Sequence, residues 1–269
     1  MNRRLSIAHL TAIDLAPPAL IETAAAAGFD AVGLRLLQVT PDSPGYPLMN
    51  DPAALRATKA ALSATGIAVS DIEFVRITPE TNVAELKAVF EVGAELGARH
   101  VITAPYDPDL TRLSDTLGQL AEEAAPCGLS PVLEFFPWTS VPDLKTCWNV
   151  VQAAGDRVGV LADSLHFDRS GSTLNDLTAI PAERLPFAHL CDAPVNPPYT
   201  TDALLHTART ARLAPGDGDI DLAKFINALP STAPIALEVP TEHQGDDYAS
   251  FFKSLFDKTH RCLNEAAQI

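Results

Sequence analysis

The chain has 269 residues, of which 47% are hydrophobic and 20% are charged, and this composition suits a large folded domain rather than a disordered segment. Its formal net charge of −15 would repel a phosphate backbone, and because no basic stripe offsets that charge, we expect no nucleic acid partner. No apolar run is long enough for a membrane span, and the first residues lack the apolar core of a secretory signal.

The four cysteines, Cys127, Cys147, Cys191 and Cys262, lie far apart and form no C-x-x-C pair. Such spacing fits neither a zinc motif nor a dense disulfide framework. We therefore expect a reducing, cytoplasmic environment.

One pattern recurs along the chain. An alanine-rich amphipathic stretch ends in glycine, and a short apolar run follows; the glycines are Gly28, Gly66, Gly97, Gly128 and Gly155. Glycine just after a helix supplies the left-handed conformation that ends it. The apolar runs do not alternate strictly, which is typical of strands buried on both faces of a parallel sheet.

Eight strands are predicted in this way, each followed by a helix. They cover residues 5–9, 31–36, 68–74, 100–104, 131–135, 158–163, 187–191 and 235–239. Strict strand–helix alternation favours parallel strands with right-handed crossovers, and eight units suit a single (β/α)₈ TIM barrel domain over residues 1–269. The alternative is an open, doubly wound sheet, but no G-x-G-x-x-G or Walker loop follows the first strand.

A long irregular segment, residues 193–218, separates the seventh strand from its helix. We predict a short helix over residues 201–209, a sharp turn at Gly216 and Gly218, and a further helix that begins near Asp221. A segment after a barrel strand lies at the end of the barrel that carries active sites, so this loop favours a functional role.

Residues that could bind a metal or transfer protons lie at or near the ends of the last four predicted strands. These residues are Glu134, Asp163, His189 and Glu238. Taken alone, each glutamate could form a loop salt bridge and the histidine could be a core residue. Together, three carboxylates would repel one another without a cation, so we predict one divalent metal ion. Oxygen ligands with one nitrogen suit Mn²⁺ or Mg²⁺, while Co²⁺ or Zn²⁺ is also possible.

The sequence around these residues resembles the xylose-isomerase-like TIM barrels, the sugar phosphate isomerases and epimerases. That family includes ketose 3-epimerases, hydroxypyruvate isomerases and inosose dehydratases. The matching motifs are LEFFPW, DSLHFDRSG, HLCDAP, RLAPGDGDID and LEVP. The Asp163-x-x-His166 spacing and the P-G-D-G-D-I-D run are the specific parts, and the resemblance covers essentially the whole chain.

The resemblance implies roles for individual residues. Glu134, Asp163, His189 and Glu238 match the metal ligands, Glu134 and Glu238 also match the catalytic acid/base pair, and His166 and Arg212 match substrate-binding positions. For Arg212 the alternative is a loop salt bridge to a nearby aspartate.

Three further substrate-binding candidates come from their positions near predicted strands. They are Glu73, His9 and Trp138. The alternative for Glu73 is a structural salt bridge, His9 points into the mouth only in the expected strand register, and the alternative for Trp138 is core or rim packing.

The resulting hypothesis is a metal-dependent isomerase or epimerase of a sugar, a sugar phosphate or a polyhydroxy ketone. Proton transfer next to a carbonyl would proceed through an enediolate that the metal stabilises. The alternative on the same site is a dehydratase of the inosose or dehydroshikimate type. An abasic-site endonuclease would need a basic surface, and a non-catalytic metal-dependent binding protein also stays open. The partner is a carbohydrate-like small molecule, and a homo-oligomer is possible because family members often form one.

Overall fold

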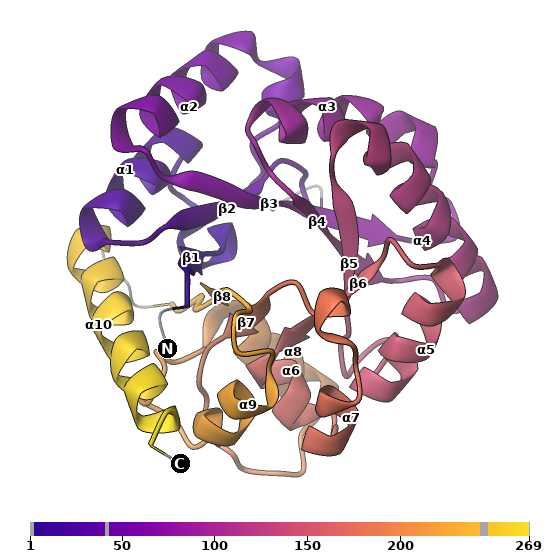
Figure 1. Cartoon of the computed structure of the whole chain (residues 1–269), viewed down its shortest axis with the longest axis vertical. Coiled ribbons are helices and arrows are strands. Elements are labelled where there is room, and N and C mark those ends of the chain that lie inside the picture. Colours follow the sequence, from indigo (N-terminus) through magenta and orange to yellow (C-terminus); the bar gives the residue numbers. More distant parts are fainter. Residues whose placement is uncertain (1–2, 41–42, 243–246, 269) are drawn as a thin grey trace.

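The computed structural model describes residues 3–40, 43–242 and 247–268 and shows a closed barrel of eight strands (Figure 1). The strands are β1 (Leu5–Ile7), β2 (Ala31–Arg35), β3 (Ala68–Ile77), β4 (His100–Pro105), β5 (Ser130–Glu134), β6 (Gly159–Asp163), β7 (Ala188–Leu190) and β8 (Ile235–Leu237). Every neighbouring pair is parallel, and β8 pairs with β1 through Leu5 and Ile235. This closure confirms the (β/α)₈ prediction and shows that the open-sheet alternative is wrong.

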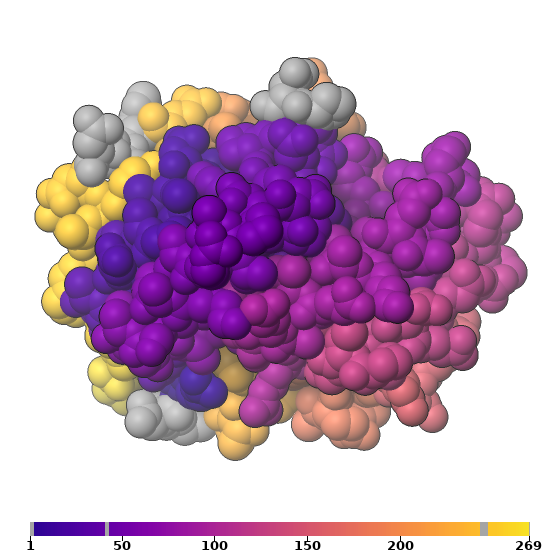
Figure 2. Space-filling model, turned by 90° about the horizontal axis from the view of Figure 1, so that it is seen from above, coloured from indigo at the N-terminus to yellow at the C-terminus, as the bar shows by residue number. Residues whose placement is uncertain are grey.

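The helices surround the barrel (Figure 1). They are α1 (Pro17–Ala27), α2 (Pro52–Thr65), α3 (Lys87–Glu95), α4 (Leu110–Ala124), α5 (Leu144–Ala154), α6 (Ser164–Arg169), α7 (Leu174–Thr178), α8 (Thr201–Thr210), α9 (Leu222–Ala228) and α10 (Tyr248–Ala266). In Figure 2 the N-terminal half of the chain, coloured indigo to magenta, forms most of the visible face. None of the described helices is long and apolar enough to cross a membrane.

The predicted glycine end of a helix is confirmed at α2, and the residues that begin this helix are equally distinctive. Asp51 accepts hydrogen bonds from the backbone N–H groups of Ala53 and Ala54, and Pro52 is the first helical residue. Gly66 ends the helix with a φ of 72°, a conformation that side chains other than glycine rarely adopt. The sequence therefore marks both the start and the stop of this helix.

The barrel interior explains how the site residues reach its mouth. Val132, Leu161, Phe187 and Ala236 pack together as one buried cluster with Ile102. Residues two apart on a strand share a face, so the residues two places further along β5, β6, β7 and β8 point the same way. Those residues are Glu134, Asp163, His189 and Glu238.

The long segment after β7 also folds as predicted, with α8 inside it and α9 after it. Gly216 has a φ of 87°, and a Cβ at Gly218 would lie 2.4 Å from Asp192 Oδ1. Asp192 accepts backbone hydrogen bonds from Ala193, Gly216 and Ile220. Asp192 therefore caps the loop, and glycine is required where the chain passes it.

Candidate metal centre and active site

The structure brings the four predicted metal ligands together. Ligand atoms of Glu134, Asp163, His189 and Glu238 all lie within 4.8 Å of one another, and all four residues are buried. His189 Nδ1 lies 3.8 Å from Glu134 Oε1, 3.8 Å from Asp163 Oδ2 and 3.5 Å from Glu238 Oε2. One imidazole nitrogen thus faces three carboxylates that come from three other strands.

Burial and mutual charge shift the pKa values of the groups in this cluster. Burial raises the pKa of Glu134 well above its usual value, and the charge of Glu238 raises it further. Burial would lower the pKa of His189, but the carboxylates, Glu238 foremost, raise it to about 10. Burial would also raise the pKa of Glu238, yet Arg212 and His189 together lower it below its usual value. His189 and Arg212 therefore supply the positive charge that faces these carboxylates.

The donor set fits a divalent metal ion. Among the described residues, the buried atoms Glu134 Oε1, His189 Nδ1 and His189 Nε2 have no hydrogen-bond partner. Burying such atoms unpaired is costly, so an unpaired cluster calls for a bound group. Three carboxylates and one imidazole suit Mn²⁺ or Mg²⁺, and tolerate Co²⁺ or Zn²⁺.

Arg212 lies between two of these ligands. Its Nη1 donates to Asp163 Oδ2 at 2.6 Å, and its Nη2 contacts Glu238 Oε2 at 2.7 Å. Nε donates to the backbone carbonyl of Ala208 at 2.9 Å, so the planar fork is held on three sides. Of the two predicted alternatives for Arg212, the structure shows a salt bridge. The residue also lines a cavity, so a substrate contact stays a prediction.

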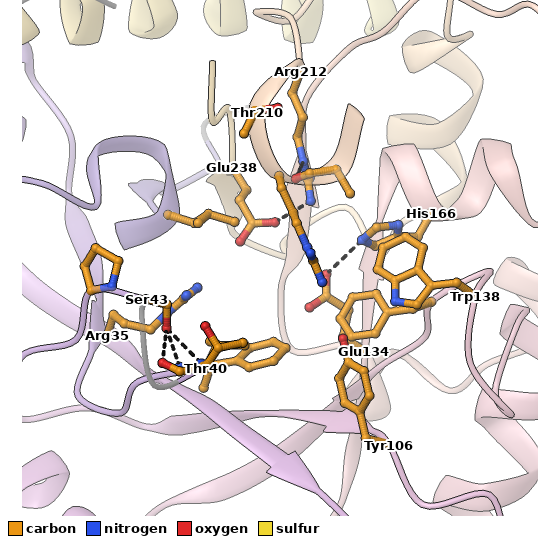
Figure 3. A pocket seen from close by; sticks show the side chains of 17 residues that line it. Arg35, Thr40, Ser43, Tyr106, Glu134, Trp138, His166, Thr210, Arg212 and Glu238 are labelled. Carbon is orange, nitrogen blue, oxygen red and sulfur yellow. Dashed lines mark hydrogen bonds and ion pairs between the residues drawn. The ribbon is translucent and has the colours of Figure 1, made fainter. Parts of the chain in front are cut away.

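A cavity of ≈ 390 Å³ opens over this cluster (Figure 3). Glu134 and Glu238 line it, whereas Asp163 and His189 do not. Its aromatic wall consists of Phe74, Tyr106, Phe136 and Trp138. The two glutamates are therefore the members of the cluster that a small molecule in the cavity can reach.

His166 and Trp138 both line this cavity, as their predicted substrate-binding role requires. His166 Nε2 lies 3.8 Å from Glu134 Oε1, and burial lowers the pKa of His166 to about 4, so the ring is neutral at pH 7. Trp138 stacks on Phe136 with ring centroids 5.1 Å apart. Contact with a substrate stays a prediction for both residues.

Glu73 and His9 do not line the cavity but hold Arg35, which does. Arg35 Nε donates to Glu73 Oε2 at 3.0 Å, and its backbone N–H donates to His9 Nδ1 at 2.9 Å. The backbone N–H of His9 in turn donates to Glu73 Oε1. Direct substrate contact by Glu73 and His9 stays a prediction. No role was predicted for Arg35, although a basic residue near the end of the second predicted strand is a visible signal.

A second cavity, of ≈ 320 Å³, lies at the opposite end of the barrel. Residues at the N-terminal ends of several strands line it, together with Arg4, Arg99 and His100, and no carboxylate residue is among them. This cavity therefore cannot hold a carboxylate-ligated metal, and the candidate site is the C-terminal one.

Comparison with known proteins agrees with this architecture. The family model of the xylose isomerase-like TIM barrels matches residues 21–257. The chain belongs to this family. Its members share the fold, but the family alone does not specify a reaction.

Two sequence relatives of this family member carry different activities. The inosose isomerase of Bacillus velezensis is 28% identical over 159 residues, which are 55% of this chain and 54% of that protein. The 3-dehydroshikimate dehydratase of Pseudomonas putida is 28% identical over 239 residues, which are 82% of this chain and 36% of that protein. The aligned region thus spans about half of the isomerase and about a third of the dehydratase.

Solved structures show the same fold. The zinc-bound IOLI protein has a TM-score of 0.78 at 20% identity, over 98% of this chain and 97% of that one. The 3-keto-D-glucoside 4-epimerase of E. coli has a TM-score of 0.73 at 15% identity, over 97% of this chain and 100% of that one. These likenesses concern the barrel and not the substrate.

Proposed function

We propose that the protein is a divalent-metal-dependent isomerase or epimerase that transfers a proton next to the carbonyl of a sugar, a sugar phosphate or a polyhydroxy ketone. One observation carries the proposal. Glu134 and Glu238 belong to the buried four-residue cluster and are also its only members that line the cavity. Two carboxylates beside one cavity are what removal and return of a proton require.

The metal would be held by Glu134, Asp163, His189 and Glu238. When bound, a divalent ion polarises a substrate carbonyl as a Lewis acid and so acidifies the neighbouring C–H. A structurally similar protein supports such a site, because the IOLI structure contains a zinc atom.

The chain's own residues would transfer the proton and stabilise the charge that develops on the substrate. Glu134 Oε1 lies free of any hydrogen bond among the described residues, so it can hold or accept a proton. Glu238 Oε2 is engaged by Arg212, which keeps this carboxylate ionised and in place as a base. The guanidinium of Arg212 can also stabilise charge that develops on a substrate oxygen. The aromatic wall gives the cavity an apolar surface beside the two glutamates.

A dehydratase on the same site is the second candidate. Its support is the alignment with the Pseudomonas putida 3-dehydroshikimate dehydratase, which covers 82% of this chain. Burial raises the pKa of Glu134 well above its usual value, so Glu134, with His166 3.8 Å away, could hold the proton that a departing hydroxyl requires. The mass of the product separates the two reactions, because dehydration loses one water and isomerisation loses nothing.

The test begins with protein stripped by EDTA and supplied with Mn²⁺, Mg²⁺, Co²⁺ or Zn²⁺. We expect one bound ion per chain by calorimetry and mass spectrometry, and turnover of a ketose or inosose panel only with metal. Because Glu134 and His189 must lose protons to bind, metal affinity should weaken as the pH falls. Absence of metal binding would refute the metal site, while metal and ligand binding without any turnover would favour a binding protein.

Cytoplasmic location and self-association stay predictions. Light scattering of the purified protein and fractionation of cells that produce it would test them.

A further inference from the structure

Arg209 is the charged residue of the cavity that the proposed function leaves unused. It lies in the last turn of α8, lines the cavity and is exposed to solvent. Within the part of the chain that the structure describes, its guanidinium has neither an ion pair nor a hydrogen bond. An exposed arginine on a surface is ordinary, but this one adjoins a site whose other charges are matched.

Every other charge along the cavity has a partner. Arg35 is paired with Glu73, and Arg212 is paired with Asp163 and Glu238. If a divalent cation binds, its two positive charges and that of Arg212 balance the three carboxylates of the cluster, with His189 neutral. Among the described residues that line the cavity, Arg209 then carries the uncompensated charge, and it is positive even though the chain has a net charge of −15.

The backbone that carries Arg209 is held firmly. Glu242 donates its N–H to the carbonyl of Thr210 at 2.9 Å, and Arg212 donates its N–H to the carbonyl of Pro240 at 3.1 Å. Leu213 forms an isolated bridge with Asp192 at the end of β7. The segment that follows β7 is therefore hydrogen-bonded to the segment that follows β8. These contacts limit the backbone entropy that would be lost when Arg209 binds a ligand.

We propose that the substrate is a polyhydroxy ketone with a carboxylate, and that Arg209 binds this carboxylate at the rim while the carbonyl end faces Glu134 and Glu238. This inference rests on the proposed function for the site, and it adds the charge of the substrate and the residue that selects for it. Arginine forms charge-assisted hydrogen bonds to both oxygens of a carboxylate. A single uncompensated positive charge matches a monoanion.

The test uses two matched pairs of probes that differ in charge. One pair is 3-dehydroshikimate and its methyl ester, and the other is D-fructuronate and D-fructose. Dissociation constants are measured by calorimetry on the Mn²⁺-loaded wild-type protein and on Arg209→Gln, Arg209→Lys and Arg99→Gln. The last variant is a matched control, because Arg99 is an exposed arginine at the opposite end of the barrel.

We expect the wild type to bind the acid of at least one pair about tenfold more tightly than its neutral partner, the usual weight of a hydrogen-bonded charge. Arg209→Gln should abolish this preference without changing the affinity for the neutral probe, Arg209→Lys should keep part of it, and Arg99→Gln should keep all of it. The preference should also shrink as the salt concentration rises, because Arg209 is exposed.

Equal affinity of the wild type for acid and neutral probes would overturn the inference, and so would a preference that survives in Arg209→Gln. Failure of every probe to bind at millimolar concentration would overturn it as well. The proposed function fails separately. A protein that binds the acids with this preference but converts none of them would refute the enzyme and leave the role of Arg209 intact.

Discussion

The two ends of the barrel hold cavities of similar size but different chemistry. The C-terminal cavity measures ≈ 390 Å³ and has buried ionisable groups at its floor, whereas the N-terminal one measures ≈ 320 Å³ and has exposed arginines at its edge. Arg4 and Arg99 are solvated there, and no carboxylate residue lines that cavity. A hollow alone therefore does not mark a site. A site is marked instead by buried charges that converge and require a cation. In TIM barrels such charges converge at the C-terminal ends of the strands.

The largest expected effect is at the floor of the C-terminal cavity. Glu134→Gln and Glu238→Gln should each lower kcat by about 10² or more, the weight of a general acid or base. Steady-state kinetics measures the loss, and metal content must be determined in parallel because both residues are proposed ligands. Glu122→Gln, an exposed position on α4, is the matched control. Full metal content with wild-type turnover in both variants would remove the acid/base roles.

Arg212 should give the next largest effect. Arg212→Lys keeps the charge but cannot bridge Asp163 and Glu238 with a planar fork. We expect kcat/KM to fall by roughly tenfold or more, about 1.4 kcal/mol of transition-state stabilisation. A purely structural arginine would instead lower the melting temperature and leave the kinetics unchanged.

Asp71, a buried residue of β3 that lines neither cavity, should affect stability rather than turnover. Burial raises its pKa to about 7, Glu73 adds to the shift, and Oδ1 has no hydrogen bond among the described residues. The folded protein therefore binds this proton more tightly than the unfolded chain does. The stabilising effect of that proton is complete below about pH 4 and is lost as the pH rises to about 7.

Asp71→Asn should accordingly flatten the dependence of the unfolding free energy on pH over this interval. Chemical denaturation at several pH values measures it. If wild type and variant keep parallel pH profiles, Asp71 is already ionised in the fold.

The smallest effect is expected at the N-terminal cavity. Unchanged turnover in a variant there would separate the two ends of the barrel more sharply. Arg99→Gln removes an exposed charge, so turnover should be unchanged and stability should shift by no more than about 0.5 kcal/mol. Thermal melting and kinetics measure both. A marked loss of activity would show that the two ends are coupled.

The sequence by itself determined the barrel and the convergence of four possible metal ligands. Glycine-ended helices separated eight apolar runs, and the carboxyl ends of parallel strands must meet at one mouth. Glu134, Asp163 and His189, within three successive strands, and Glu238, just after the eighth, could therefore be expected to converge even though more than a hundred residues separate the first from the last.

Only the tertiary structure decided which charges are matched. The ion pairs of Arg212 with Asp163 and Glu238 and the hydrogen bond of Arg35 to Glu73 depend on barrel closure and on side-chain direction. The same holds for Arg209, which has no partner within residues 3–40, 43–242 and 247–268. Spacing along the chain carries no record of these directions, because β8 meets β1 only once the sheet has closed, and a one-residue change in register would turn each side chain to the other face.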